Sequence, residues 1–285
     1  MSPLQTLQAK AEAFRQMHLG TDVVVLPNAW DHASAALMVA AGFPVIATTS
    51  AGIAFAQGYP DGEYMGRTRM LAVVGRIAAQ SAVPVTADLE AGYGPTPEDV
   101  AATVTGAIEA GVVGCNIEDA DPHTGQLLDF DLSVARIRAG RAAADKLKVP
   151  FVLNARTDPY LARIGDAQAC FAESVRRANA YLDAGAMCAY VPGPGDSETV
   201  GKLAKAIHGP LNVLSALAGR TGLSLAEARR VGVRRLSVGG SLMLTTATLV
   251  RRVLADIQGK GDFSYAAQSI TNREMNVLMK TLPQP

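Results

Sequence analysis

The sequence has little of what marks secreted, nucleic-acid-binding or membrane-spanning proteins. Its 285 residues include only three cysteines, Cys115, Cys170 and Cys188, whose odd number and spacing argue against a disulfide framework and predict buried, reduced thiols in a cytoplasmic protein. Lys and Arg balance Asp and Glu at 26 each, so no basic surface is expected for nucleic acid or an anionic membrane. No apolar run reaches about 18 residues, so we expect no membrane span. The first residues do not resemble a signal peptide.

The chain is instead rich in short apolar blocks. Hydrophobic residues make up 49% of it and charged residues 18%, which suits a parallel sheet, an oligomer or both. The length allows one large domain or two ordinary ones. Because no low-complexity linker divides the chain, we predict a single domain over residues 1–285.

Eight short runs rich in β-branched residues alternate with alanine-rich stretches of helical character. The predicted strands are Val23–Pro27, Val45–Thr49, Val85–Leu89, Gly114–Glu118, Phe151–Arg156, Cys188–Val191, Asn212–Ala216 and Arg235–Val238. Eight βα units of this size predict a (β/α)₈ TIM barrel. An open doubly wound sheet is the alternative, but no GxGxxG motif follows the first strand.

Two further segments lie outside the expected barrel of residues 21–258. Residues 1–20 contain an amphipathic helix over Leu4–His18, and residues 259–285 form a helical appendage over Phe263–Met279. A helix beyond a closed barrel needs a surface to cover. We expect that surface on the same barrel or on a neighbouring subunit of a homodimer or homotetramer.

Acidic residues follow two successive predicted strands. Asp88 and Glu90 come after the third strand, and Glu118 and Asp119 end the fourth. In a continuing strand the spacing of Asp88 and Glu90 would place both on one side. Carboxylates gathered at one sheet edge repel one another when all of them are ionised, which is unfavourable. A bound hard divalent cation usually neutralises this charge. Oxygen ligands without paired His or Cys predict Mg²⁺, with Mn²⁺ as the alternative, in a metal-assisted enzyme. We expect Glu118 in the outer sphere of this metal and Asp119 in support of the loop or of a basic partner.

Other strand ends carry polar residues that suit a carboxylate ligand. Thr49, Ser50 and Ala51 follow the second strand and offer hydrogen-bond donors. Further along, Asp61 either reaches the site or caps a Pro-Asp-Gly turn. Arg156 ends an apolar strand, where it either grips a substrate carboxylate or forms a salt bridge with Asp158 or a metal-site acid.

Two further side chains are candidates. His123 lies in a glycine-containing loop that suits a mobile lid, where it serves as proton donor or carboxylate binder or is simply solvated. Trp30 follows the first strand and either walls the pocket or packs in the core.

Together these residues resemble the isocitrate lyase/phosphoenolpyruvate mutase superfamily. The most specific part is Asp88-x-Glu90-x-Gly92-Tyr93-Gly94 followed by Ile117–Asp119. The other pieces that carry the resemblance are Leu26–Asp31, Thr48–Gly52, Gly58–Asp61, Gly114–Asn116 and Asn154–Asp158. The resemblance implies a (β/α)₈ barrel whose last helix is often swapped between subunits.

The resemblance also implies a chemistry. Mg²⁺ would be held by Asp88, with Glu90 and Glu118 reaching it directly or through water, and would be chelated by an α-keto acid or its enolate. Thr49, Ser50, Ala51 and Arg156 would hold the carboxylate end, and Asp61 matches the family's substrate-proximal aspartate.

Departures from the family narrow the expected activity. The isocitrate and methylisocitrate lyases carry a catalytic lid cysteine, and the phosphonate branch carries a lid lysine and asparagine, whereas Pro122–Leu127 has none of these. In addition, Glu90 replaces the usual aspartate. We therefore expect a Mg²⁺-dependent lyase or decarboxylase that cleaves a carbon–carbon bond beside a pyruvate-like enolate in a small keto or hydroxy di-acid. A phosphonomutase or C–P hydrolase, and a non-catalytic keto-acid binder, are the alternatives.

Overall fold

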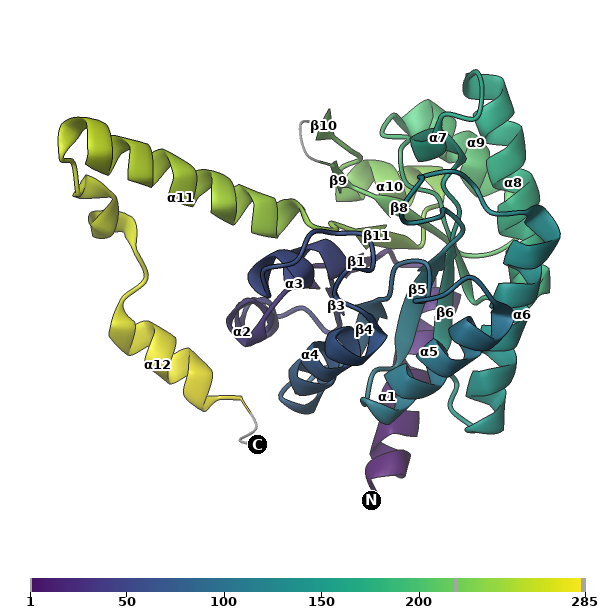
Figure 1. Cartoon of the computed structure of the whole chain (residues 1–285), viewed down its shortest axis with the longest axis horizontal. Helices are drawn as coiled ribbons and strands as arrows, with labels where there is room; N and C mark the ends of the chain where they lie inside the picture. The colour runs from purple at the N-terminus through teal and green to yellow at the C-terminus, as the bar shows by residue number, and fades with distance from the viewer. Residues whose placement is uncertain (1, 218–219, 283–285) are drawn as a thin grey trace.

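A closed barrel of parallel strands forms the centre of the protein (Figure 1). The computed structural model describes residues 2–217 and 220–282. Around the barrel the order is β1, β11, β8, β7, β6, β5, β4, β3 and β2. β1 and β2 are two parts of the first strand, separated at Pro27. Because β1 pairs with β11 while β2 pairs with β3, this one strand joins both edges and closes the sheet.

All eight predicted strands are present, and their ends differ from the prediction by no more than two residues. The barrel strands are β1 (Val24–Leu26), β2 (Asn28–Ala29), β3 (Ile46–Thr48), β4 (Val85–Asp88), β5 (Gly114–Glu118), β6 (Val152–Arg156), β7 (Cys188–Tyr190), β8 (Leu211–Leu214) and β11 (Arg235–Ser237). The two-residue strands β9 (Ala216–Leu217) and β10 (Arg220–Thr221) pair as a separate antiparallel hairpin that the sequence did not predict. The (β/α)₈ prediction is therefore confirmed.

One helix precedes the first strand, and most of the later helices follow strands and cover the outside of the barrel (Figure 1). They are α1 (Pro3–Leu19), α2 (His32–Ala40), α3 (Ser50–Ala56), α4 (Arg67–Ala79), α5 (Pro97–Glu109), α6 (Phe130–Lys146), α7 (Pro159–Ala162), α8 (Ala167–Asp183), α9 (Ser197–Ala206), α10 (Leu225–Val231), α11 (Ser241–Lys260) and α12 (Asn272–Lys280), with a 3₁₀ helix η1 (Ser264–Gln268) before α12. Thr96 caps α5 and bonds reciprocally with Asp99, and Gly111, with φ +87°, follows the end of that helix.

The N-terminal helix α1 packs on the core through Ala11, Phe14 and His18. Phe14 is fully buried and lies close to Gly114 at the start of β5. A Cβ at Gly114 would come within 3.1 Å of the Phe14 ring and 2.6 Å of the Val152 carbonyl oxygen, so only glycine fits there. The predicted N-terminal helix thus contributes buried side chains to the core of the barrel.

The C-terminal helices behave differently. Figure 1 shows α11 running away from the barrel and α12 returning towards α2. None of the 20 residues of α11 is buried, and Leu249, Val250 and Leu254 are among its exposed side chains. The extra C-terminal helix was predicted, although it begins at Asn272 rather than at Phe263.

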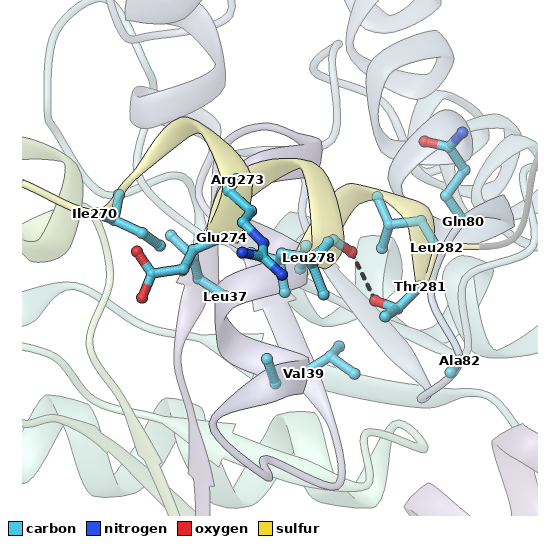
Figure 2. Close-up of a pocket in the computed structure, with 13 residues that line it drawn as sticks. Leu37, Val39, Gln80, Ala82, Ile270, Arg273, Glu274, Leu278, Thr281 and Leu282 are labelled. Atoms are coloured by element: carbon cyan, nitrogen blue, oxygen red, sulfur yellow. Dashed lines mark hydrogen bonds between the residues drawn. The ribbon is translucent and has the colours of Figure 1, made fainter.

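A hollow of about 600 Å³ separates α12 from α2 (Figure 2). Leu37 and Val39 line it from α2, and Ile270 and Leu278 line it from the C-terminal segment. None of the acidic residues at the strand ends lines it. Across the described residues, no helix is both long and apolar enough to cross a membrane.

Candidate active site

Asp88, the last residue of β4, is held in a fixed orientation by its two neighbouring strands. One carboxylate oxygen accepts the backbone N–H of Ser50 at 3.0 Å and its hydroxyl at 2.8 Å. The other oxygen accepts the side-chain amide of Asn116 at 2.7 Å. The Asp88 N–H in turn donates to the Thr48 hydroxyl at 3.0 Å. These donors come from the β3–α3 junction and from β5, so the barrel itself aims this carboxylate.

The sequence missed two features of this arrangement. Ser50 begins helix α3 instead of lying in an open loop, and Thr49 is its N-cap, accepting from the Gly52 N–H at 3.3 Å. Asn116 was not selected, although it stands directly opposite Asp88 in the register of β4 and β5. Its position two residues before Glu118 on the same strand was the available signal.

Glu90 binds the segment that carries Asp61. One of its carboxylate oxygens accepts the backbone N–H groups of Gly62, at 3.1 Å, and Glu63. The other accepts the Tyr93 hydroxyl at 3.0 Å. β4 ends at Asp88 and Glu90 has φ +52°, so it does not continue the strand on which the one-sided placement was based. Its longer side chain nevertheless reaches the pocket.

Burial raises the pKa of three carboxyl groups that line the pocket, those of Glu118, Glu90 and Asp61. Burial raises the pKa of Glu90 to about 7, and the nearby Asp88 and Asp61 carboxylates add to the rise. Burial and the Asp88 charge likewise raise the pKa of Asp61 above its usual value. The buried carboxylates therefore repel one another, and a bound cation or a proton would reduce this repulsion.

Arg156 forms both of the salt bridges that the sequence offered as alternatives to substrate binding. Its Nη1 lies 2.5 Å from Glu118, and its Nε and Nη2 donate to Asp158 at 2.8 and 2.7 Å. These contacts use three of the five N–H groups of the guanidinium. Burial opposes the charge, but Asp158 and Glu118 together raise the pKa of Arg156. Two N–H groups remain for a ligand.

Asp119 faces away from Glu118 and supports the loop after β6, as predicted. Its carboxylate accepts the Thr157 hydroxyl at 2.6 Å and the Asp158 N–H at 3.0 Å. From α8, Tyr181 donates to it at 2.6 Å and Arg177 at 3.2 Å. This buried network fixes the chain next to Arg156. The sequence analysis expected a basic partner for Asp119 but did not identify Arg177.

These side chains surround a pocket of about 320 Å³ at the carboxyl ends of β3 to β6. The residues that line it are Ser50, Asp61, Gly62, Glu90, Glu118, Ala120, Asp121, Pro122, Gly125, Arg156, Asp158, Leu161 and Ala162. The structure thus brings Ser50, Asp61, Glu90, Glu118 and Arg156 together, while Asp88 is bonded to Ser50 but does not line the pocket itself.

Four other candidates lie outside this lining. The His123 ring packs edge-on against Tyr64, with centroids 5.7 Å apart. Trp30 lines a separate hollow beside α11, while Thr49 is buried at the start of α3, with Ala51 inside that helix. Catalytic or substrate-binding roles for these four residues stay predictions.

The donor set fits a hard divalent cation. Within the described residues, no three Asp, Glu, His or Cys side chains are gathered closely enough to form a ready cage of ligands. Mg²⁺ does not need one, because it commonly binds one or two carboxylates and completes its shell with water and substrate oxygens. Asp88 suits direct ligation, and Glu90 and Glu118 suit contact through water.

A (β/α)₈ barrel with an acidic pocket at the carboxyl ends of its strands is the arrangement of a barrel enzyme. The chain belongs to the phosphoenolpyruvate phosphomutase family, whose model matches residues 14–258, and so to the isocitrate lyase/phosphoenolpyruvate mutase superfamily. This superfamily includes lyases, phosphonomutases and a hydrolase, and the predicted membership is confirmed.

Individual proteins show the same relationship. An uncharacterised protein of Mycobacterium tuberculosis is 34% identical over 248 residues, covering 86% of this chain and 89% of its own. A Burkholderia cenocepacia structure described as a lyase/mutase is 38% identical with a TM-score of 0.88 and covers 96% of both chains. Oxaloacetate acetylhydrolase, solved with its product oxalate, is 26% identical with a TM-score of 0.84 and covers 94% of this chain and 93% of its own.

Proposed function

We propose that this protein is a Mg²⁺-dependent lyase that cleaves a carbon–carbon bond beside a pyruvate-like enolate in a small keto or hydroxy acid. The observation that carries the proposal is that Asp88, held by Ser50 and Asn116, adjoins through Ser50 a pocket that Ser50, Glu118 and Arg156 line. The oxalate complex of the related oxaloacetate acetylhydrolase supports a small, chelating carboxylate as ligand.

Each side chain has a proposed role. Asp88 holds the cation, and Glu90 and Glu118 bind its water ligands. When bound, the cation supplies Lewis-acid charge that stabilises an enolate oxygen. The two remaining N–H groups of Arg156 bind the carboxylate of the pyruvate-like part. Asp61, with its raised pKa, is placed to hold or accept a proton at its carboxylate.

The loop between β5 and α6 is the proposed lid. Ala120 and Leu127 form an antiparallel bridge, and the Asp121 N–H donates to the Gln126 carbonyl at 2.8 Å. The lid is therefore a folded turn at the rim of the pocket. His123, on this turn, lies beside Tyr64 and becomes available for proton transfer only if the lid shifts.

We also propose a homodimer or homotetramer in which α11 covers a neighbouring subunit. The support is the exposure of its apolar side chains, Val250 and Leu254 among them. These two also line a hollow of about 540 Å³ beside Trp30 that a second helix could fill.

The test of the activity is pyruvate release from a panel of keto and hydroxy acids, with Mg²⁺ or with chelator. We expect Mg²⁺-dependent release from a substrate with a carbon–carbon bond to break, and its loss in Asp88→Asn. Release from phosphonopyruvate alone would favour the C–P alternative. Metal-dependent binding of oxalate without any turnover would favour the non-catalytic binder.

A further inference from the structure

The lining of the active-site pocket is strongly unbalanced in charge. Within the described part of the chain, Arg156 is its sole Lys, Arg or His, against the carboxylates of Asp61, Glu90, Glu118, Asp121 and Asp158. Even a bound divalent cation and a proton on Glu90 would leave this lining with a net negative charge. Each anionic group of a substrate must therefore find its own cationic partner.

The pocket has cationic partners for one carboxylate only. Arg156 is already engaged by Glu118 and Asp158, and two of its N–H groups remain. The carboxylate and keto oxygens of the pyruvate-like end of the substrate would occupy both of these N–H groups and the cation.

The walls beyond that end are apolar or negative. Leu161 and Ala162 of α7 line one side, and Leu161 is 41% exposed. Helix α7 is attached directly to the Arg156 strand end, since the Ala162 N–H donates to the Asp158 carbonyl at 2.9 Å. The next residue, Arg163, has φ +52° and is not part of the lining.

The lid adds apolar surface and a further negative charge. Ala120 and Pro122 line the pocket beside Asp121. The N–H groups of Thr124 and His123 bind the Asp121 carboxylate and lower its pKa, so it stays ionised. No Lys or Arg occurs in residues 119–129.

We propose that the substrate carries a single carboxylate, at its pyruvate-like end, and an uncharged apolar tail that lies against Leu161 and Ala162. This inference rests on the proposed function, and it replaces the di-acid expected from the sequence with a monoacid. A second carboxylate beside Asp121 would meet a like charge and no cationic partner, which is unfavourable.

A suitable reaction is aldol cleavage of a 4-hydroxy-2-oxo acid with an alkyl tail. The hydroxyl loses its proton, the bond between C3 and C4 breaks, and its electron pair enters the enolate of pyruvate. The enolate then takes up a proton at C3. The products are pyruvate and an uncharged aldehyde, and no oxidant or reductant is needed.

The test compares two ligands that differ only at the far end: 2-oxopentanoate, which ends in a methyl group, and 2-oxoglutarate, which ends in a carboxylate. Binding to the full-length protein is measured calorimetrically with Mg²⁺ present. We expect 2-oxopentanoate to bind about tenfold more tightly or better. Equal or tighter binding of 2-oxoglutarate would overturn the inference.

Oxalate separates failure of this inference from failure of the proposed function. Absence of Mg²⁺-dependent oxalate binding would count against the metal site itself. Binding of oxalate without the expected preference, or without binding of either longer acid, would count against the apolar tail alone.

Two variants test where the apolar tail of the substrate lies. Leu161→Lys places a cation on the wall and should shift the preference towards 2-oxoglutarate by about tenfold. Ile164→Lys is the matched control, because Ile164 is also 41% exposed but does not line the pocket, and it should leave the preference unchanged. An unchanged preference in Leu161→Lys would contradict the placement, provided that circular dichroism shows a folded protein.

Discussion

Ser50 donates two hydrogen bonds to the same carboxylate oxygen of Asp88, from its N–H at 3.0 Å and from its hydroxyl at 2.8 Å. This contact connects the start of α3 to the end of β4. It leaves the carboxylate little freedom to rotate, which favours a cation at a fixed position. The proposed metal site therefore depends on a residue that is not itself a metal ligand.

The Ser50 hydroxyl should matter for metal affinity. We expect Ser50→Ala to weaken Mg²⁺ binding by roughly ten- to a hundredfold, the usual effect of removing a group that orients a metal ligand. Calorimetric titration of Mg²⁺ checks this. Ser197→Ala is the control, because Ser197 also begins a barrel helix, α9, and is not among the residues that line the pocket. Equal affinities in both variants would remove Ser50 from the site.

Arg156 should not be replaceable by lysine. An ammonium group cannot bridge Glu118 and Asp158 and still present two N–H groups to a carboxylate. We expect Arg156→Lys to raise KM strongly, and to weaken oxalate binding by at least about tenfold. Arg176→Lys, at a side chain that is 51% exposed and paired with Glu173, is the control. An unaltered KM in Arg156→Lys would mean that the arginine is purely structural.

The raised pKa of Glu90 predicts a pH-dependent stability without divalent cations. The pKa of Glu90 is about 7 in the folded protein, against an ordinary value of 4.5 for a glutamate, so Glu90 binds a proton more tightly in the native state. Its contribution to stability is therefore complete below about pH 4.5 and is lost as the pH rises through about 7. Glutamine at position 90 cannot titrate. From pH 5 to pH 8 the free energy of unfolding of Glu90→Gln should therefore rise relative to that of the wild type, by on the order of 2–3 kcal/mol.

Denaturant unfolding in chelator at the two pH values measures that difference. Added Mg²⁺ should raise the melting temperature of the wild type more at pH 8 than at pH 5, because the cation competes with the proton for the carboxylates. A stability difference between wild type and Glu90→Gln that does not change with pH would contradict the assignment.

The exposed face of α11 predicts the assembly. Leu254→Asp places a charge on the apolar face that we propose to cover a neighbour, and should shift the oligomer towards smaller species in sedimentation analysis. Thr245→Asp adds the same charge to the opposite side of the helix and should leave the assembly unchanged. A wild type that sediments as a monomer would contradict the proposed assembly.

The sequence predicted the barrel well because its strands are buried on both sides. Each reads as a short apolar run, and an αL glycine such as Gly111 ends the preceding helix. Helix α3 was missed because it is short and mostly buried, so it lacks a polar face. At Gly52 an added Cβ would lie 2.9 Å from Trp30, a packing requirement that no local pattern reveals.

The site was predictable in its residue types and less so in its connections. Glu118 and Asp119 are adjacent and chemically alike, yet one faces Arg156 and the other faces α8. Strand geometry predicts that neighbours point apart, but not which partners they meet. The binding of Glu90 to the Gly62 and Glu63 N–H groups joins residues 27 and 28 positions apart, and only the folded chain shows it.

The measurement that most directly tests the central claim is Mn²⁺ binding followed by electron paramagnetic resonance in the wild type and in Asp88→Asn. We expect the wild type to bind a single Mn²⁺ that Mg²⁺ displaces and whose spectrum changes when oxalate is added. Asp88→Asn should lose this site while keeping its circular dichroism spectrum. Mn²⁺ binding of wild-type affinity in a folded Asp88→Asn protein would contradict the account.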